Sequence, residues 1–255
     1  AIGPSSWTYL AGSNDAVTLG NSSSLYVTSG TGHTVDVTGT NATAQVSNST
    51  VVAEAGSAVT VTGTNDAVTA KTNAAVSVSA ASDTVDVVGT GVQLYLQNGT
   101  AVTVESGAGA VTQAWGGGSG LAVTLKGNSS IVAAYGTNTV AVSGTGNTAT
   151  LQSSSVTLAA GAGIAVAGSS STINATTGAT IAISGSYDTV NAGSGATVSV
   201  AGSYHTVNAS NDTIAIGPSS WTYLAGSNDA VTLGNSSSLY VTSGTGHTVD
   251  VTGTN

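Results

Sequence analysis

Residues 180–209 read TIAISGSYDTVNAGSGATVSVAGSYHTVNA and contain four short segments in which Val or Ile alternates with Thr, Ser, Ala or Asn. The segments begin at Thr180, Thr189, Thr197 and Thr206, so their starts lie eight or nine residues apart. Strict alternation of apolar and polar residues predicts a β-strand that buries one face. The Gly, Ser and Asn residues between the segments favour turns. The stretch therefore predicts a succession of short strands joined by tight turns.

The same pattern runs through most of the chain. A strand of four or five residues cannot bury its face alone, so each strand has to stack on others. The linkers are longer than the two-residue loops that antiparallel hairpins favour. One turn motif recurs at every second strand, for example at Gly185 and again at Gly202. We therefore expect an all-β, right-handed parallel β-solenoid with about 17 residues per coil and two principal sheets, with a triangular three-sheet coil as the alternative.

The chain also contains a long exact repeat. Residues Ala1–Asn41 recur without a change as Ala215–Asn255, so the repeating unit is 1–214. Packing tolerates conservative substitutions, so complete identity over so long a stretch needs another cause. Either the parent protein is a tandem array of near-identical units, which we favour, or the chain was engineered to end as it began. We expect one solenoid unit over 1–214 and the start of a second over 215–255, in a single continuous rod.

The number of strand steps in the repeat raises a difficulty. Between Ala16 and its copy Ala230 we count 25 steps, which is an odd number. Two strands per coil require an even number in an exact repeat, so we expect one segment to be a loop, a bulge or a corner. The candidates are Ala114–Gly120, where the spacing stretches, and Gly3–Trp7 with its copy Gly217–Trp221.

Composition and charge exclude several classes of function. The chain has no Cys, Met or Phe, and only 5% of its residues are charged, against ~25% in an ordinary soluble domain. A net charge of −9 with two Lys and no Arg excludes binding to nucleic acid or to anionic membrane surfaces. The longest nearly apolar run, Leu158–Gly168, is too short to span a bilayer. We expect neither a nucleic-acid partner nor membrane insertion.

Several turns carry an aspartate just before a strand, as in Ser13-Asn14-Asp15 and in Ser210–Gly217, which reads SNDTIAIG. These turns resemble the glycine-aspartate nonapeptide of RTX (repeats-in-toxin) secreted bacterial proteins. The resemblance implies a parallel β-roll in which turn aspartates and glycine carbonyls bind Ca²⁺. The pattern departs from the family, because the Gly-Gly-x-Gly run is missing and His33, Asn147 or His205 replaces Asp in sister coils. The alternative is that each aspartate caps its own turn. The calcium candidates are Asp15, Asp66, Asp83, Asp188, Asp212 and Asp229.

The wider composition, rich in Thr, Ser, Asn, Val and Gly, resembles the repeat regions of filamentous-haemagglutinin-type and other large bacterial exoproteins. That resemblance implies a secreted, cell-surface rod or adhesin. The few aromatic residues are candidates for exposed contacts with glycans, cell surfaces or another partner; the alternative is that they fill a corner of the core. These residues are Trp7, Tyr9, Trp115, Trp221 and Tyr223.

The sequence offers little to catalysis. It contains no Cys nucleophile and no Gly-x-Ser-x-Gly elbow. His33 and Asp36 form the nearest approach to a dyad, but their odd spacing along a strand places them on opposite faces. We expect no enzymatic activity and no cofactor. Outward threonines could form the flat ladder of an ice-binding protein, and the candidates are Thr18, Thr60, Thr69, Thr103 and Thr112.

These exclusions, together with a fold that provides length, predict a mechanical role. We expect a structural rod of an extracellular fibre, adhesin stalk or biofilm-matrix filament, whose partners are neighbouring repeat units or further copies of the chain, including end-to-end assembly. The alternative is a Ca²⁺-dependent RTX-like module of a secreted toxin or enzyme, and the third hypothesis is ice binding.

Overall fold

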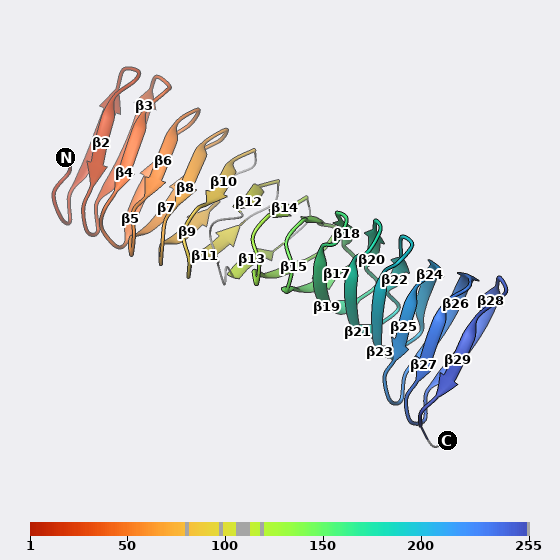
Figure 1. The fold of residues 1–255 in the computed structure, drawn as a ribbon. Coiled ribbons are helices and arrows are strands. Elements are labelled where there is room, and N and C mark those ends of the chain that lie inside the picture. Colours follow the sequence, from red (N-terminus) through yellow and green to blue (C-terminus); the bar gives the residue numbers. More distant parts are fainter. Residues whose placement is uncertain (80–81, 97–98, 106–112, 118–119, 254–255) are drawn as a thin grey trace. The chain divides into compact units, whose positions relative to one another are not determined.

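The computed structural model describes residues 1–79, 82–96, 99–105, 113–117 and 120–253, with the backbone alone for 113–117. The described residues form 29 β-strands and no helix, so no helix among them could cross a bilayer. Contacts divide the chain into two compact units, Ala1–Ala133 and Ala134–Asn255. Each unit is a stack of short strands in successive coils (Figure 1).

The strands alternate between two sheets. The odd-numbered sheet has the order β1 (Trp7–Ala11), β3 (Ser24–Ser29), β5 (Ala42–Gln45), β7 (Ala58–Thr62), β9 (Ala75–Val78), β11 (Gln93–Leu96), β13 (Gln113–Gly117), β15 (Ile131–Tyr135), β17 (Asn147–Gln152), β19 (Gly163–Ser169), β21 (Thr180–Ser186), β23 (Thr197–Ser203), β25 (Thr213–Ile216), β27 (Ala230–Leu233) and β29 (Thr248–Val251).

The even-numbered sheet has the order β2 (Ala16–Leu19), β4 (Thr34–Val37), β6 (Thr50–Ala53), β8 (Ala67–Ala70), β10 (Thr84–Val87), β12 (Ala101–Val104), β14 (Ala122–Leu125), β16 (Thr139–Val142), β18 (Ser155–Leu158), β20 (Thr172–Ala175), β22 (Thr189–Asn191), β24 (His205–Ser210), β26 (Trp221–Ser227) and β28 (Ser238–Ser243).

Each strand pairs in parallel with the strand two places along the chain. In the even sheet, Val68 of β8 is the register partner of Val85 in β10, which is in turn the partner of Val102 in β12. Each of these steps matches the coil length expected from the sequence and takes the chain once round, through two strands and two turns. The predicted parallel β-solenoid is therefore confirmed, and its named strands form two sheets.

The core between the sheets is narrow and aliphatic, because inward positions hold Val, Ile, Leu and Ala. Each coil is buried by the coils on either side of it. Val35 and Val37 of β4 are 0% exposed, whereas their copies Val249 and Val251 in β29 are 45% and 54% exposed. The two pairs have the same sequence surroundings, but β4 is covered by β6 and β29 has no coil after it in this chain. Nearest-neighbour stacking therefore supplies the burial.

The prediction that one segment of the repeat would be a loop, a bulge or a corner in place of a strand is wrong. Trp7–Ala11 and its copy Trp221–Ser227 are both strands, and so is Gln113–Gly117; residues 118–119 lie outside the described part. Instead, each strand of the first copy has its counterpart in the other sheet: β1 corresponds to β26, and β2 to β27. The physical reason is that strands of both sheets use the same alternation of inward Val and outward Thr or Ser, so one sequence fits either sheet.

The boundary of the sequence repeat is not a structural boundary. The junction of residues 214 and 215 lies inside strand β25, which pairs with β23 before it and β27 after it. The second copy also reproduces the details of the first: both carry a bulge after the Tyr-Leu pair, at Leu10/Ala11 and at Leu224/Ala225. The second copy therefore continues the same solenoid without a linker.

Candidate functional site

Polar side chains just before the strands form hydrogen-bonded rows along both turns of the solenoid, one row before even-numbered strands and one before odd-numbered strands. We call these rows together the turn ladder. Oδ1 of Asp66 accepts the backbone N–H of Ser49 at 2.9 Å, and Oδ1 of Asp83 accepts the backbone N–H of Asp66 at 2.8 Å. Each carboxyl thus caps an amide of the preceding coil, which the bend would otherwise leave without a partner. The same contact joins Asp188 to Ser171, Asp212 to Ala196 and Asp229 to Asp212.

The ladder differs from the expected self-capping turns. Among these described aspartates only Asp212 also caps its own turn, where its Oδ2 accepts the backbone N–H of Ser210 at 2.8 Å. The other oxygen of Asp66 is buried and has no hydrogen-bond partner among the described residues. Burial raises the pKa of Asp66 to about 6, with a lowering contribution from the Ser49 hydrogen bond and a raising one from Asp83. Burial likewise raises the pKa of Asp83, Asp188 and Asp229.

Histidine takes the place of aspartate in three turns and faces an aspartate of the preceding coil. Nδ1 of His205 lies 3.3 Å from the backbone nitrogen and 3.5 Å from Oδ2 of Asp188, while its Nε2 lies 3.1 Å from the carbonyl oxygen of Ala201. A neutral ring with its proton on Nε2 satisfies the amide and the carbonyl together. Equivalent pairs join His33 to Asp15 at 3.4 Å and His247 to Asp229 at 3.2 Å. Each of these contacts joins residues one coil apart, a spacing that could have revealed them in the sequence.

The structure places the calcium candidates within this ladder. Asp66, Asp83, Asp188, Asp212 and Asp229 are at most 3% exposed, and their Oδ1 atoms already accept backbone N–H groups. Asp15 lies beside His33. In the described residues, no group of three or more His, Asp or Glu side chains is placed to hold a metal ion. Calcium binding stays a prediction.

The threonine rows do not form one continuous ladder. Thr18, Thr69 and Thr103 lie in the even sheet, but Thr60 lies in the odd sheet. Within the even sheet, Asp36 and Asp86 occupy positions in the same outward row. Thr112 lies outside the described residues. The two lysines also lie along the even sheet, each paired with a glutamate of the preceding coil, Lys71 with Glu54 and Lys126 with Glu105.

Four of the five candidate aromatic contacts fall at the start of a sequence repeat. Trp7 and Tyr9 are 66% and 64% exposed, and their rings lie 5.4 Å apart. Their copies Trp221 and Tyr223 are only partly exposed. Trp115 belongs to β13, and its side chain lies outside the described part of the chain.

Trp221 is less exposed than Trp7 because it is stacked on Tyr204, which in turn is stacked on Tyr187. Neither tyrosine was among the aromatic candidates from the sequence. Tyr187 and Tyr204 have φ angles of 63° and 62°, the left-handed region that Asn14 and Asn65 occupy in equivalent turns. A bulky residue there costs roughly 1–2 kcal/mol. The signal was present, because Gly-Ser-Tyr at 185–187 and 202–204 replaces the Gly-Ser-Asn of 12–14.

The strained tyrosines build an aromatic stack across the repeat boundary. The Tyr187 and Tyr204 rings are 5.2 Å apart and nearly parallel, and Trp221 follows Tyr204 at 5.4 Å. Tyr240 continues the stack at 5.9 Å from Trp221, with an interplanar angle of 2°. Two rings thus come from the end of one repeat and two from the start of the next. We call these four rings the junction stack.

Comparison with known protein families, curated proteins and solved structures finds no match. The role of the junction stack and the turn ladder therefore has to be argued from their geometry alone. Both features join a coil to the coil before it.

Replacing tryptophan in the two copies tests the junction stack. We expect Trp221→Ala to lower the free energy of unfolding by about 1–3 kcal/mol, because it removes a ring held between two others. The matched change Trp7→Ala, in an identical local sequence, should cost less than about 1 kcal/mol, since Trp7 is largely exposed. Chemical denaturation followed by circular dichroism measures both. Equal costs would show that the stack contributes nothing.

Proposed function

We propose that this chain is part of a non-catalytic structural rod, built from tandem solenoid units, in an extracellular fibre, adhesin stalk or biofilm-matrix filament. The observation that supports the proposal is the repeat junction. The sequence boundary lies within β25, and the second copy pairs in register with the end of the first unit. A module that joins its successor without a linker can extend indefinitely, which is what a fibre requires.

Hydrogen–deuterium exchange on the intact chain tests the junction. We expect backbone amides of residues 206–233 to exchange as slowly as those of β19–β23, because both regions lie in unbroken parallel ladders. Fast exchange confined to residues 210–220 would indicate a flexible linker and contradict the proposal. Electron microscopy of the purified protein supplies a second readout: uniform rods are expected, and compact round particles would contradict a rod.

The extracellular part of the proposal needs a separate test. An antibody against the chain should label intact cells or the surrounding matrix of the organism that produces it. Labelling only after the cells are permeabilised would overturn the extracellular assignment while leaving the rod itself in place.

The calcium-dependent alternative is distinguished by adding a chelator. We expect the β-sheet circular dichroism signal to persist in EDTA, because backbone amides already engage the Oδ1 atoms of the buried turn aspartates. An RTX-like module would instead lose its β signal in EDTA and regain it with Ca²⁺.

A further inference from the structure

The second half of the chain exposes no Asp, Glu, Lys or Arg side chain over a long stretch. Residues 127–249 contain no Lys or Arg, and their only acids, Asp188, Asp212 and Asp229, are at most 3% exposed. Soluble surfaces usually carry ~25–35% charged residues. The exterior of this stretch consists mainly of Ser, Thr, Asn, Gly and Ala with a few aromatic rings, together with Gln152 and the valines Val241 and Val249 of the last coils.

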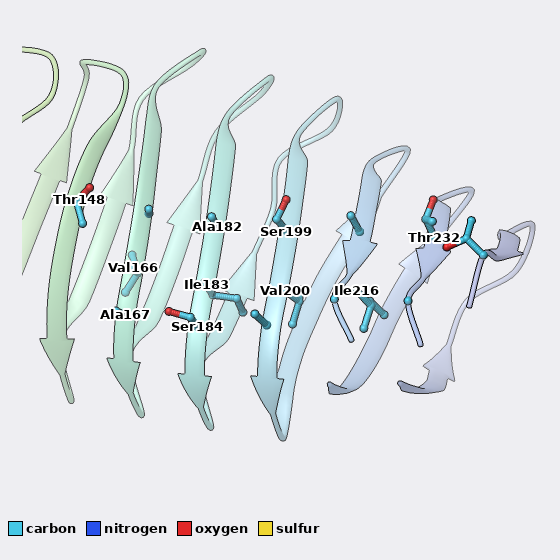
Figure 2. Close-up of a pocket in the computed structure, with 16 residues that line it drawn as sticks. Thr148, Val166, Ala167, Ala182, Ile183, Ser184, Ser199, Val200, Ile216 and Thr232 are labelled. Carbon is cyan, nitrogen blue, oxygen red and sulfur yellow. The ribbon is translucent and has the colours of Figure 1, made fainter. Parts of the chain in front are cut away.

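One face of this uncharged stretch is hollowed. The outer side of strands β17, β19, β21, β23, β25 and β27 forms a shallow groove of about 620 Å³ (Figure 2). Its central row consists of Ala165, Ala182, Ser199 and Ala215, which are register partners on successive strands. Figure 2 shows Ala182 and Ser199 on neighbouring strands in the middle of the groove. We call this surface the groove face.

We propose that the groove face is an interaction surface on which a second copy of this chain docks, sheet against sheet. Charge supports this choice of partner. A partner that brought a charged side chain to the groove would bury it without a counter-ion, at a cost of several kcal/mol. The residues that line the groove in another copy include no Asp, Glu, Lys or Arg, so two linings meet without that cost. The nearest charge in the central row is the exposed Asp250, the register partner of Thr232 at the C-terminal end of the face, so we expect the two copies to dock with these ends apart.

Side-chain size supports the same pairing. Ala has no rotamer freedom to lose, and Ser and Thr have little, so ordering this face costs little entropy. Small side chains also let two sheets approach as closely as the interdigitated dry interfaces of stacked β-sheets. The in-register rows of β19, β21 and β23 provide the regular surface that such packing needs.

The size of the groove face sets the expected strength. Six strands ~4.8 Å apart, each four to seven residues long at ~3.3 Å per residue, cover roughly 400–500 Å² per copy. A stable interface buries about 800 Å² per partner. Docking of single chains should therefore be weak and visible only at high concentration. In a tandem array, where the proposed function applies, each repeat exchanges the two sheets, so every second unit presents its groove face on the same side. Those repeated faces would strengthen docking by avidity; docking of the single chain does not depend on that function.

Sedimentation velocity over a range of protein concentrations tests the proposal. We expect the sedimentation coefficient of the intact chain to rise with concentration. The double variant Ala182→Lys/Ser199→Lys should remain monomeric, because it places two like charges in the face. The control Thr157→Lys adds a charge at an exposed outward position of β18 in the other sheet and should associate like the parent chain. A parent chain that stays monomeric at its solubility limit, or a double variant that associates equally, overturns the proposal.

Cross-linking provides a test that does not depend on the lysine variants folding. The chain contains no cysteine, so Ser199→Cys introduces a single thiol into the groove face. Oxidation should give a disulfide-linked dimer, whereas Thr157→Cys on the other sheet should give far less. Equal yields from the two variants would show that the copies meet at random. A failure here leaves the rod proposed above untouched, since that is tested by hydrogen exchange at the junction.

Discussion

Replacing Gly185 with alanine is expected to lower the free energy of unfolding by more than about 3 kcal/mol. Gly168, Gly185 and Gly202 are register partners on β19, β21 and β23, and all three have φ angles between 107° and 140°. A Cβ at Gly185 would lie 1.8 Å from the carbonyl oxygen of Gly168. That oxygen belongs to the neighbouring strand of the ladder, so it cannot move away without breaking parallel hydrogen bonds.

Gly178→Ala is the matched control. Gly178 also has a left-handed φ, 71°, but a Cβ there would meet no atom within 4 Å. The substitution should cost only the backbone strain, roughly 1 kcal/mol. Chemical denaturation of the two variants under the same conditions gives the comparison. If both substitutions cost the same, then the close approach of successive coils at the glycine row is not limiting.

The glycine row illustrates what the sequence could predict. The alternation of Val and Thr, the breakers between segments and the regular return of the turn motif are local features, and each has one physical meaning. They predicted the parallel winding and strands such as Thr84–Val87 and Thr197–Val200, the second of which continues to Ser203 in the structure. A recurring Gly at 168, 185 and 202 fits the same period, because only glycine tolerates a carbonyl so close to its Cα.

Contacts between coils were harder to predict. The pairing of His33 with Asp15 and the stacking of Tyr204 on Trp221 join residues one coil apart, and they appear only when successive coils are laid over one another. The prediction that one segment of the repeat would not form a strand was wrong for a related reason. It assumed that a sequence belongs to one sheet, whereas the repeated stretch forms strands of either sheet because inward and outward positions alternate identically in both.

The groove face could not be predicted from the local sequence pattern. The composition shows that charged residues are few, but it does not show which parts of the surface expose them. Glu54, Lys71, Glu105 and Lys126 all precede residue 127, and the three later acids before residue 250 point into the turn ladder. Only the burial of Asp188, Asp212 and Asp229 shows that the exterior over residues 127–249 exposes no acidic or basic side chain.

Acid should stabilise this protein through the turn ladder, the opposite of ordinary acid denaturation. Burial raises the pKa of Asp66 from 3.8 to about 6, so between these values the folded chain binds more protons than the unfolded chain. Stability is then greatest below about pH 4, falls as the pH rises through 6, and is constant above that. At 1.36 kcal/mol per pKa unit, Asp66 alone lowers the free energy of unfolding by about 3 kcal/mol between pH 2 and pH 8, and most of that change falls between pH 4 and pH 8.

Asp66→Asn isolates this contribution. Asparagine keeps the Oδ1 acceptor for the backbone N–H of Ser49 but cannot ionise, so the variant should be about 3 kcal/mol more stable than the parent at pH 8 and close to it in stability at pH 4. Subtracting the two curves removes the groups that both proteins share and that do not interact with Asp66, whereas Asp83, whose charge contributes to the raised pKa of Asp66, remains part of the difference. The control Asp86→Asn makes the same substitution at an exposed outward position of β10, away from the turn ladder. A variant Asp66→Asn less stable than the parent at pH 8 would mean that the ionised carboxylate holds the coils together, and that the orphaned Oδ2 has a partner in solution.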